Sequence, residues 1–183
     1  MAVKGEPIAP NKGSHAQGRI LGTNLTPKEQ VQTYLNIWKT EDYKGFDSDL
    51  VRDQIRLVSA AAEPTATATF AYTVTAPFCN RLGALHGGAA ALVFDICTSV
   101  AIAPIASDIW GVARVSRTLN ITYLRPAPMG TECLIDCEVM HAGKRLCMIR
   151  GVMKRKDDGA VLSTAEHGKV LNDLSKDKCF DLL

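Results

Sequence analysis

The pattern of apolar and polar positions divides the chain into a helical N-terminal part and a β-rich remainder around one long apolar segment. Residues 27–41 carry apolar side chains at helical spacing, and Thr26 and Glu29 are placed to cap that helix. Thr65–Thr75 alternates threonine with apolar residues, as in a half-buried strand. His86–Ser107 is too long and too uniformly apolar for a strand, so it is predicted to be a buried helix.

The remaining apolar runs predict strands joined by turns. Clusters of Gly, Pro and Asp separate the predicted strands Ile55–Ala61, Ala113–Leu124, Thr131–Met140, Arg145–Lys156 and Ala160–Leu171. The last three are joined by tight turns and predict an antiparallel meander. A helix that is apolar on every side must be covered, and one curved antiparallel sheet wrapped around it does this. The expected fold is α+β, with an extra N-terminal helix.

The chain divides into four predicted segments. Residues 1–24 have the composition of a flexible arm, and residues 25–54 form a helical extension. Residues 55–171 form the main domain, and residues 172–183 form a C-terminal tail. The N-terminus lacks the apolar core of a secretory signal and has few arginines for a transit peptide. We therefore expect a cytoplasmic protein, with a mitochondrial location as the alternative.

Charge and composition narrow the classes of function. The net charge of +2 gives no strong nucleic-acid footprint. Asp95 and Pro104 interrupt the apolar run, which favours a core helix over a membrane span. The six cysteines show no CxxC and no zinc-ligand spacing, so we expect reduced, mostly buried thiols. The four histidines are scattered, and neither a metal nor a cofactor is predicted.

Asp95 is the most informative residue, because it is a lone carboxylate inside the apolar run. Burying a charge is costly, and apolar surroundings raise the pKa of a carboxyl group, which suits a general base. Gly87 and Gly88 begin the same predicted helix, where backbone N–H groups stabilise developing negative charge. This pair of features is the minimum needed to attack an acyl carbonyl with water. The structural alternative is an aspartate that caps or pairs within the core.

The helix geometry separates these two features. Gly87 and Asp95 are eight residues apart, which is about 12 Å along a helix. His86 and Asp95 lie on opposite helix faces, since nine steps of about 100° make two and a half turns. One chain therefore cannot easily bring both to one carbonyl, whereas two chains related by a two-fold axis can. We expect a homodimer with two shared sites, each using Gly87 of one protomer and Asp95 of the other.

Two polar residues before the predicted helix have more than one interpretation. His86 could be a base, an orienting group or a residue bonded into its loop. Asn80 could position water or polarise a carbonyl, although asparagine commonly shapes turns. With Gly87 and Asp95 they form a specific combination.

These residues carry a family resemblance. Asn80–Gly88 (NRLGALHGG), then Asp95, then Leu119–Ala127 (LNITYLRPA) closely resemble the PaaI-like hotdog-fold acyl-CoA thioesterases, over about residues 55–170. The resemblance implies a hotdog fold, a dimer or a tetramer made of two dimers, and hydrolysis of acyl-CoA to a free acid and coenzyme A. Coenzyme A is then part of the substrate rather than a cofactor.

The resemblance also implies roles for individual residues. Asp95 is the general base or nucleophile, and the N–H of Gly87 binds the thioester oxygen. Asn80 and His86 shape the site, and Ser116 assists the attacking water from the subunit that supplies Asp95. The sequence departs from the family at Arg117 and Thr118, where an apolar and an acidic residue are common. Arg117, together with Arg114, favours an acidic or polar acyl group.

Coenzyme A carries phosphates, so cations are expected near the entrance. The predicted substrate-binding residues are Gly88, Arg81, Arg125, Lys154, Arg155 and Lys156. For the last three, a solvated strand end beside a turn is the alternative. Two other functions stay open on the same fold: release of an acyl or polyketide chain from a carrier protein, and non-catalytic acyl-CoA binding. A dehydratase is disfavoured, because the sequence shows no nearby Asp–His pair.

Overall fold

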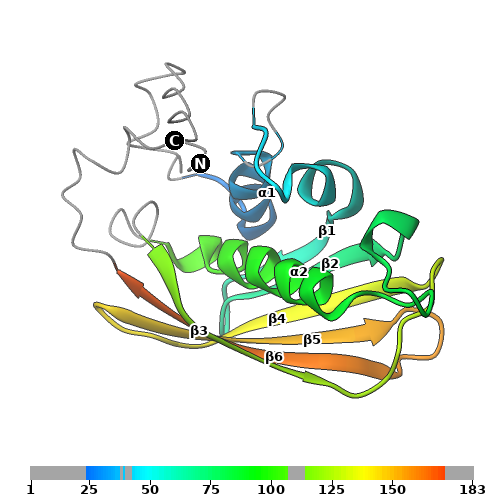
Figure 1. Ribbon diagram of the computed structural model, residues 1–183. Helices are drawn as coiled ribbons and strands as arrows, with labels where there is room; N and C mark the ends of the chain where they lie inside the picture. The colour runs from blue at the N-terminus through cyan, green and yellow to red at the C-terminus, as the bar shows by residue number, and fades with distance from the viewer. Residues whose placement is uncertain (1–23, 38, 40–42, 107–113, 172–183) are drawn as a thin grey trace, which may run out of the picture.

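The computed structural model describes residues 24–37, 39, 43–106 and 114–171. The predicted tail 172–183, and all of the predicted arm except Asn24, lie outside these ranges. Figure 1 shows a curved sheet with one helix, α2, lying across its concave face and a second helix, α1, above it. The predicted α+β architecture, with a sheet around a central helix and an extra N-terminal helix, is confirmed.

The six strands of the described sheet follow the order β1-β2-β4-β5-β6-β3 and are all antiparallel. Their bounds are β1 Arg56–Ala61, β2 Thr67–Thr73, β3 Arg114–Tyr123, β4 Glu132–Ala142, β5 Leu146–Arg155 and β6 Val161–Leu171. Strands β4, β5 and β6 form the predicted meander. Strand β3 pairs with β6 and lies at the edge of the sheet, with a register shift between Ser116 and Thr118.

Helix α1 (Pro27–Ile37) begins where its capping residues predict. The N–H of Thr26 donates to Glu29 Oε2 at 2.7 Å, and the N–H of Glu29 donates to Thr26 Oγ1 at 3.3 Å. Val31 and Leu35 are fully buried in the main core. The helical extension therefore shares one core with the sheet. It continues into a π-helical turn, Leu50–Gln54, just before β1.

Helix α2 spans Gly87–Val100 and is followed by a short 3₁₀ turn, Ala103–Ile105. The prediction that the helix continues to Ser107 is wrong, because Pro104 has no N–H to extend it. Gly87–Ile105 is apolar and long enough to cross a membrane by those criteria alone. Here the stretch packs on the sheet, and just over half of it is buried.

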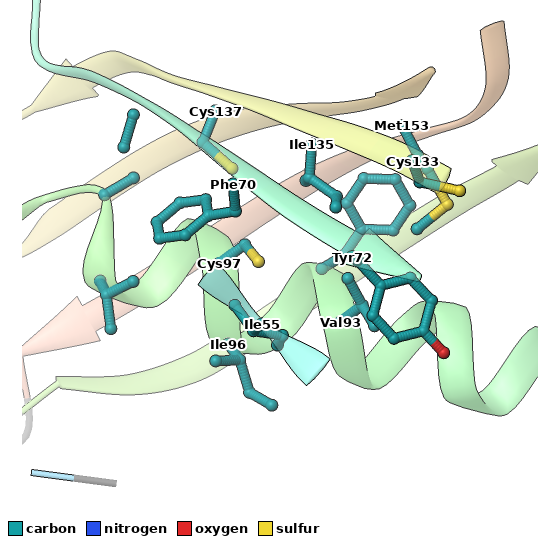
Figure 2. Close-up of a cluster of buried hydrophobic side chains, with 14 of the residues drawn as sticks. Ile55, Phe70, Tyr72, Val93, Ile96, Cys97, Cys133, Ile135, Cys137 and Met153 are labelled. Atoms are coloured by element: carbon teal, nitrogen blue, oxygen red, sulfur yellow. The ribbon is translucent and has the colours of Figure 1, made fainter. Parts of the chain in front are cut away.

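The core fills the space between α2 and the sheet. Figure 2 shows Phe70 and Tyr72 of β2 beside Ile135 of β4, with Val93 and Cys97 of α2 facing them. Cys97, Cys133, Cys137 and Cys147 are buried cysteines that form no disulfide within the described chain. Burial raises the pKa of Cys133 to about 11, and it also raises the pKa of Cys97 and of Cys137. These sulfurs are therefore protonated packing groups rather than nucleophiles.

Gly151 of β5 sets the distance between α2 and the sheet. A Cβ atom at this position would lie 2.7 Å from Phe94 Cδ1 and 3.3 Å from Thr98 Cγ2. No side chain fits there unless the Phe94 ring or the helix shifts. This close approach holds the middle of α2, including Asp95, against β6 and β3.

We expect Gly151→Ala to lower the free energy of unfolding by about 1–3 kcal/mol, because it overpacks a tight contact. Urea unfolding followed by circular dichroism measures the change. The matched control is the double variant Phe94→Leu/Gly151→Ala, which should lose less than the sum of its two single variants. An unchanged unfolding midpoint in Gly151→Ala would contradict this account of the contact.

Candidate active site

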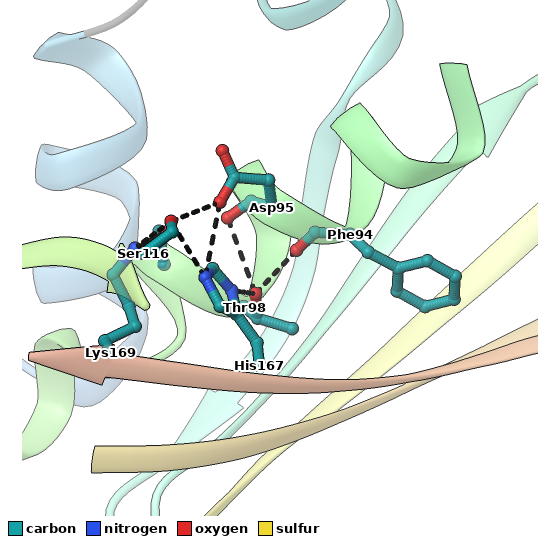
Figure 3. A network of polar contacts seen from close by, with 7 residues as sticks. Phe94, Asp95, Thr98, Ser116, His167 and Lys169 are labelled. Atoms are coloured by element: carbon teal, nitrogen blue, oxygen red, sulfur yellow. Dashed lines mark hydrogen bonds and ion pairs between the residues drawn. The ribbon is translucent and has the colours of Figure 1, made fainter. Parts of the chain in front are cut away.

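A polar cluster joins the middle of α2 to the edge of the sheet (Figure 3). Ser116 Oγ of β3 lies 2.9 Å from Asp95 Oδ1 of α2 and 2.9 Å from His167 Nε2 of β6. His167 Nε2 is also 3.4 Å from Asp95 Oδ1. Lys169, two residues after His167, places its Nζ 3.2 Å from Ser116 Oγ. Three chain segments that are distant in sequence thus meet at one serine hydroxyl.

Thr98 fixes the tautomer of His167. The Thr98 hydroxyl donates its single proton to the carbonyl of Phe94 at 2.6 Å. Thr98 Oγ1 must then accept from the imidazole Nδ1, which lies 2.6 Å away. The ring therefore carries a proton on Nδ1. In the neutral ring, Nε2 is the acceptor that faces Ser116.

His167 is neutral at physiological pH. Its ring is fully buried, and burial is the main cause that lowers its pKa to about 4. The positive charge of Lys169 lowers the pKa further, and the carboxylate of Asp95 opposes both effects. The close approach of Asp95 and His167 is therefore not an ion pair at neutral pH.

Two expectations about Asp95 need correction. The side chain is 41% exposed in the protomer, so it is not enclosed in the apolar core as the sequence predicted. The reason is its position on the helix face that turns towards edge strand β3. The expectation that Asp95 has no histidine beside it is also wrong, because β6 supplies His167 from 72 residues further along the chain. That ring is neutral, with Nδ1 bonded to Thr98 and Nε2 covered by Ser116 Oγ at 2.9 Å, which leaves it no free position for a substrate.

The sequence reasoning missed His167, Lys169 and Thr98. A signal was present in β6, where the alternation of a strand puts Ser163, His167 and Lys169 on the face that also carries buried Ala165. Polar residues at core-facing positions of a strand need partners, and here the partners belong to α2 and β3. Their sequence separation hid the cluster.

The start of α2 forms a second polar region. His86 is the N-cap, and its Nδ1 accepts from the N–H of Gly88 at 3.0 Å. The neutral His86 ring therefore carries its proton on Nε2, which makes it a donor and leaves no free lone pair for a general base. Within the described chain, Gly88 N–H is used by this cap, whereas Gly87 N–H has no hydrogen-bond acceptor. Tyr123 donates to the carbonyl of Gly87 at 2.8 Å and holds this end of the helix.

A pocket of about 390 Å³ opens beside Gly87, and its lining includes Asn80, Tyr123 and Arg125. Asn80 Oδ1 accepts from the N–H groups of Leu82 and Ala84 at 2.9 and 3.3 Å, so its amide nitrogen is the group left to donate. Arg125 donates one N–H to the carbonyl of Val161 at 2.7 Å. The Asn80 amide and the Arg125 guanidinium therefore offer hydrogen-bond donors at this pocket, which suits a carbonyl oxygen or an anion.

The predicted cation cluster at the end of β5 is paired with carboxylates. Salt bridges join Lys154 to Asp136 at 2.8 Å, Arg155 to Asp158 at 2.7 Å and Lys156 to Glu132 at 2.6 Å. Arg155 and Lys156 line a different hollow, which contains neither Asp95 nor Gly87. The contacts favour the alternative of a solvated strand end for these three residues. Arg125 is the predicted cation that lines the pocket at Gly87, and the exposed Arg81 follows Asn80.

The two polar regions lie at opposite ends of β3. Ser116, beside Asp95, and Tyr123, beside Gly87, are seven residues apart on this strand, or about 20 Å. A base with its serine therefore occupies one end, and a set of donors around a helix start occupies the other. Together these are the parts of an acyl-transfer hydrolase, divided between two places in one protomer.

Comparisons with known proteins agree with this class. The thioesterase superfamily model matches residues 82–162. Acyl-coenzyme A thioesterase 13 of Mus musculus is 32% identical over 127 residues, which cover 69% of this chain and 85% of that protein. The zebra fish thioesterase superfamily member 2 structure has a TM-score of 0.67 at 28% identity, and the match covers 81% of this chain and 99% of that one. The chain belongs to the thioesterase superfamily.

A solved structure of Escherichia coli PaaI shares the fold, with a TM-score of 0.64 at 18% identity, and the match covers 80% of this chain and 96% of that one. The hotdog fold and the family resemblance read from Asn80–Gly88, Asp95 and Leu119–Ala127 are confirmed. The roles of individual residues stay predictions.

The buried His167 makes stability depend on pH. Its pKa is about 4 in the folded protein and near 6.5 when unfolded, so the unfolded chain binds more protons between these values. This contribution to stability is complete above pH 6.5 and is lost as the pH falls towards 4. We expect unfolding midpoints that decrease over this range, with a shallower decrease in His167→Asn. Equal slopes for the two proteins would show that the ring is not held neutral.

Proposed function

We propose that the protein hydrolyses acyl-CoA thioesters to a free acid and coenzyme A, with Asp95 of one protomer and Gly87 of its partner acting on the same carbonyl. Superfamily membership and the similarity to acyl-coenzyme A thioesterase 13 of Mus musculus support the reaction. The observation that supports a site shared between two protomers is the separation, along β3, of the base from the hydrogen-bond donors.

The proposed reaction uses each region for one step. Asp95 takes a proton from water as the water oxygen bonds to the thioester carbon. The charge that develops on the carbonyl oxygen is met by the N–H of Gly87 at the positive end of α2. The C–S bond then breaks, and the thiolate of coenzyme A recovers the proton from Asp95. Ser116, bonded to the carboxylate, fixes the direction in which Asp95 faces.

The edge strand offers a way to join the two regions. Within the described sheet, strand β3 has an unpaired edge and many exposed residues, so an antiparallel copy can add to it. Because of the register shift after Ser116, Ser116 and Tyr123 lie six paired positions apart on β3, with Asn120 midway between them. A two-fold axis at Asn120 would therefore place Ser116 opposite Tyr123 of the partner subunit. The base of one protomer then meets the donors of the other. This dimer is part of the proposal.

Replacing Asp95 by Asn tests the base, because the amide keeps the shape and loses the proton acceptor. We expect turnover of acyl-CoA to fall by roughly 10²–10⁴-fold with little change in substrate binding. Release of free thiol from acyl-CoA thioesters of graded chain length measures this, with acyl-carrier protein as a parallel substrate. Unchanged turnover in Asp95→Asn would remove the assigned role.

Gly87→Pro deletes the proposed oxyanion donor selectively. Proline is well suited to the first helical position, and His86 before it already has the extended backbone that proline requires (φ −66°, ψ 136°). Gly87→Ala is the matched control, because it keeps the N–H and its Cβ would lie 3.4 Å from the Tyr123 ring. We expect Gly87→Pro to be folded and at least about 10²-fold slower, and Gly87→Ala to stay close to normal.

Mixing the two inactive variants tests the shared site. When Asp95→Asn and Gly87→Pro protomers reassociate randomly at equal concentration, half of the dimers are mixed, and each mixed dimer has one intact site. We therefore expect recovery of about a quarter of normal activity, from the symmetry of the dimer. Sites complete within one protomer would show no recovery, which would refute the dimeric arrangement while leaving the activity itself in place.

A further inference from the structure

We propose that Lys169 is a positioning residue that directs the proton taken from water onto Asp95 and away from His167. Lys169 acts through Ser116 and His167 rather than on the substrate. The inference rests on the proposed function, since it concerns the proton that the hydrolysis releases.

The Lys169 side chain is built into the cluster from the core side. It is 95% buried, and its Nζ donates to Ser99 Oγ of α2 at 2.7 Å and to Ser116 Oγ of β3 at 3.2 Å. Burying an ammonium is costly, and packing alone would favour an apolar residue at this position. An ammonium can only donate, so one lone pair of the Ser116 hydroxyl is committed to Lys169.

The remaining contacts leave the cluster one proton short. The Ser116 hydroxyl has a single proton, but it faces two acceptors at 2.9 Å, Asp95 Oδ1 and His167 Nε2. Both cannot be satisfied while Asp95 is ionised and the ring is neutral. One further proton satisfies all the contacts: a protonated Asp95 donates to Ser116, and Ser116 donates to His167. The cluster thus has a place for the proton that the water gives up.

That extra proton has two resting places, and the charge of Lys169 distinguishes them. It can sit on Asp95 beside a neutral ring, or on His167 as an imidazolium beside an ionised carboxylate. Lys169 repels the imidazolium and attracts the carboxylate. The repulsion acts between two buried groups, whereas Asp95 is 41% exposed and solvent weakens the attraction. The balance favours the proton on Asp95, from which the leaving thiolate can recover it.

The surroundings of His167 supply few other charges. Within the described chain, α2 presents Asp95 and the Thr98 hydroxyl to the ring, and β3 presents the Ser116 hydroxyl. Strand β5 places Ile149 beside it, and Lys169 is the charged neighbour on its own strand. Without Lys169, the imidazolium becomes easier to form. It would then fill the proton's place before water arrives, and Asp95 would lose its function as the base.

The test replaces Lys169 by Met, which has a similar length and no charge. NMR titration of the ring nitrogens should show the pKa of His167 rising from about 4, although not to its ordinary value of 6.5, because the ring stays buried. The higher pKa leaves fewer rings neutral at pH 5.5 and changes little at pH 8. We therefore expect the ratio of kcat at pH 5.5 to kcat at pH 8 to fall relative to the unaltered enzyme, by at most about tenfold, which is the limit for a pKa of 6.5, with KM little changed. A merely structural defect would lower activity equally at both pH values.

Lys28→Met, at an exposed position of α1, is the matched control and should leave the titration and the pH profile unchanged. A His167 pKa that does not move in Lys169→Met would overturn the proposal, as would an unchanged ratio of kcat values. If Lys169→Met does not fold, the unaltered protein still decides the matter: a ring titrating near 6.5, or a neutral ring protonated on Nε2, would refute the arrangement. These NMR measurements need no substrate, so their outcome does not depend on the activity assay. In that assay, a protein that hydrolyses no acyl-CoA would contradict the proposed function instead.

Discussion

The contact between Ser116 and Asp95 is the one on which the site depends, because it ties the middle of the core helix to the edge of the sheet. The contact forms only when α2 lies close to β5, and Gly151 allows that approach. Thr98 then fixes the rotation of the helix, since its hydroxyl bonds both its own helix and His167 of β6. Packing sets the distance and the polar link sets the orientation. Asp95 is consequently presented at the sheet edge in one direction.

The two polar regions have opposite hydrogen-bonding characters. The free side-chain groups of His86 and Asn80 at the start of α2 are donors. Their acceptor atoms, His86 Nδ1 and Asn80 Oδ1, already bond to local backbone N–H groups. The free groups around Asp95 are acceptors, because Thr98 holds the His167 proton on Nδ1, and Lys169 supplies a donor from the core side. A thioester under attack by water needs both, a donor for its oxygen and an acceptor for the water proton. The chain therefore holds two complementary halves, and between them β3 forms the unpaired edge of the sheet as far as the sheet is described.

Local sequence signals predicted the elements well, and long-range contacts explain what they missed. The capping pair Thr26 and Glu29, the alternation in β2 and the tight turns of the meander act within a few residues, so the sequence reveals them. Asp95 was visible as a lone carboxylate, but its exposure depends on β3 lying at the sheet edge, which no local pattern encodes. His167 and Lys169 were hidden for the same reason. The pairing of the cations at 154–156 was hidden as well, because their carboxylate partners lie on β4 and in the turn after β5.

The polar cluster also explains why a core can contain a lysine and a histidine without becoming unstable. A buried polar network is tolerable when its members satisfy one another, and Thr98, Ser99 and Ser116 supply partners to both residues. The unsatisfied contact lies at Ser116, next to the partly exposed carboxylate of Asp95. A proton arriving from the solvent side removes that deficit. The free protein loses stability here because one acceptor at Ser116 lacks a proton. It regains that stability when Asp95 takes a proton from water, so this contact favours the first step of the reaction.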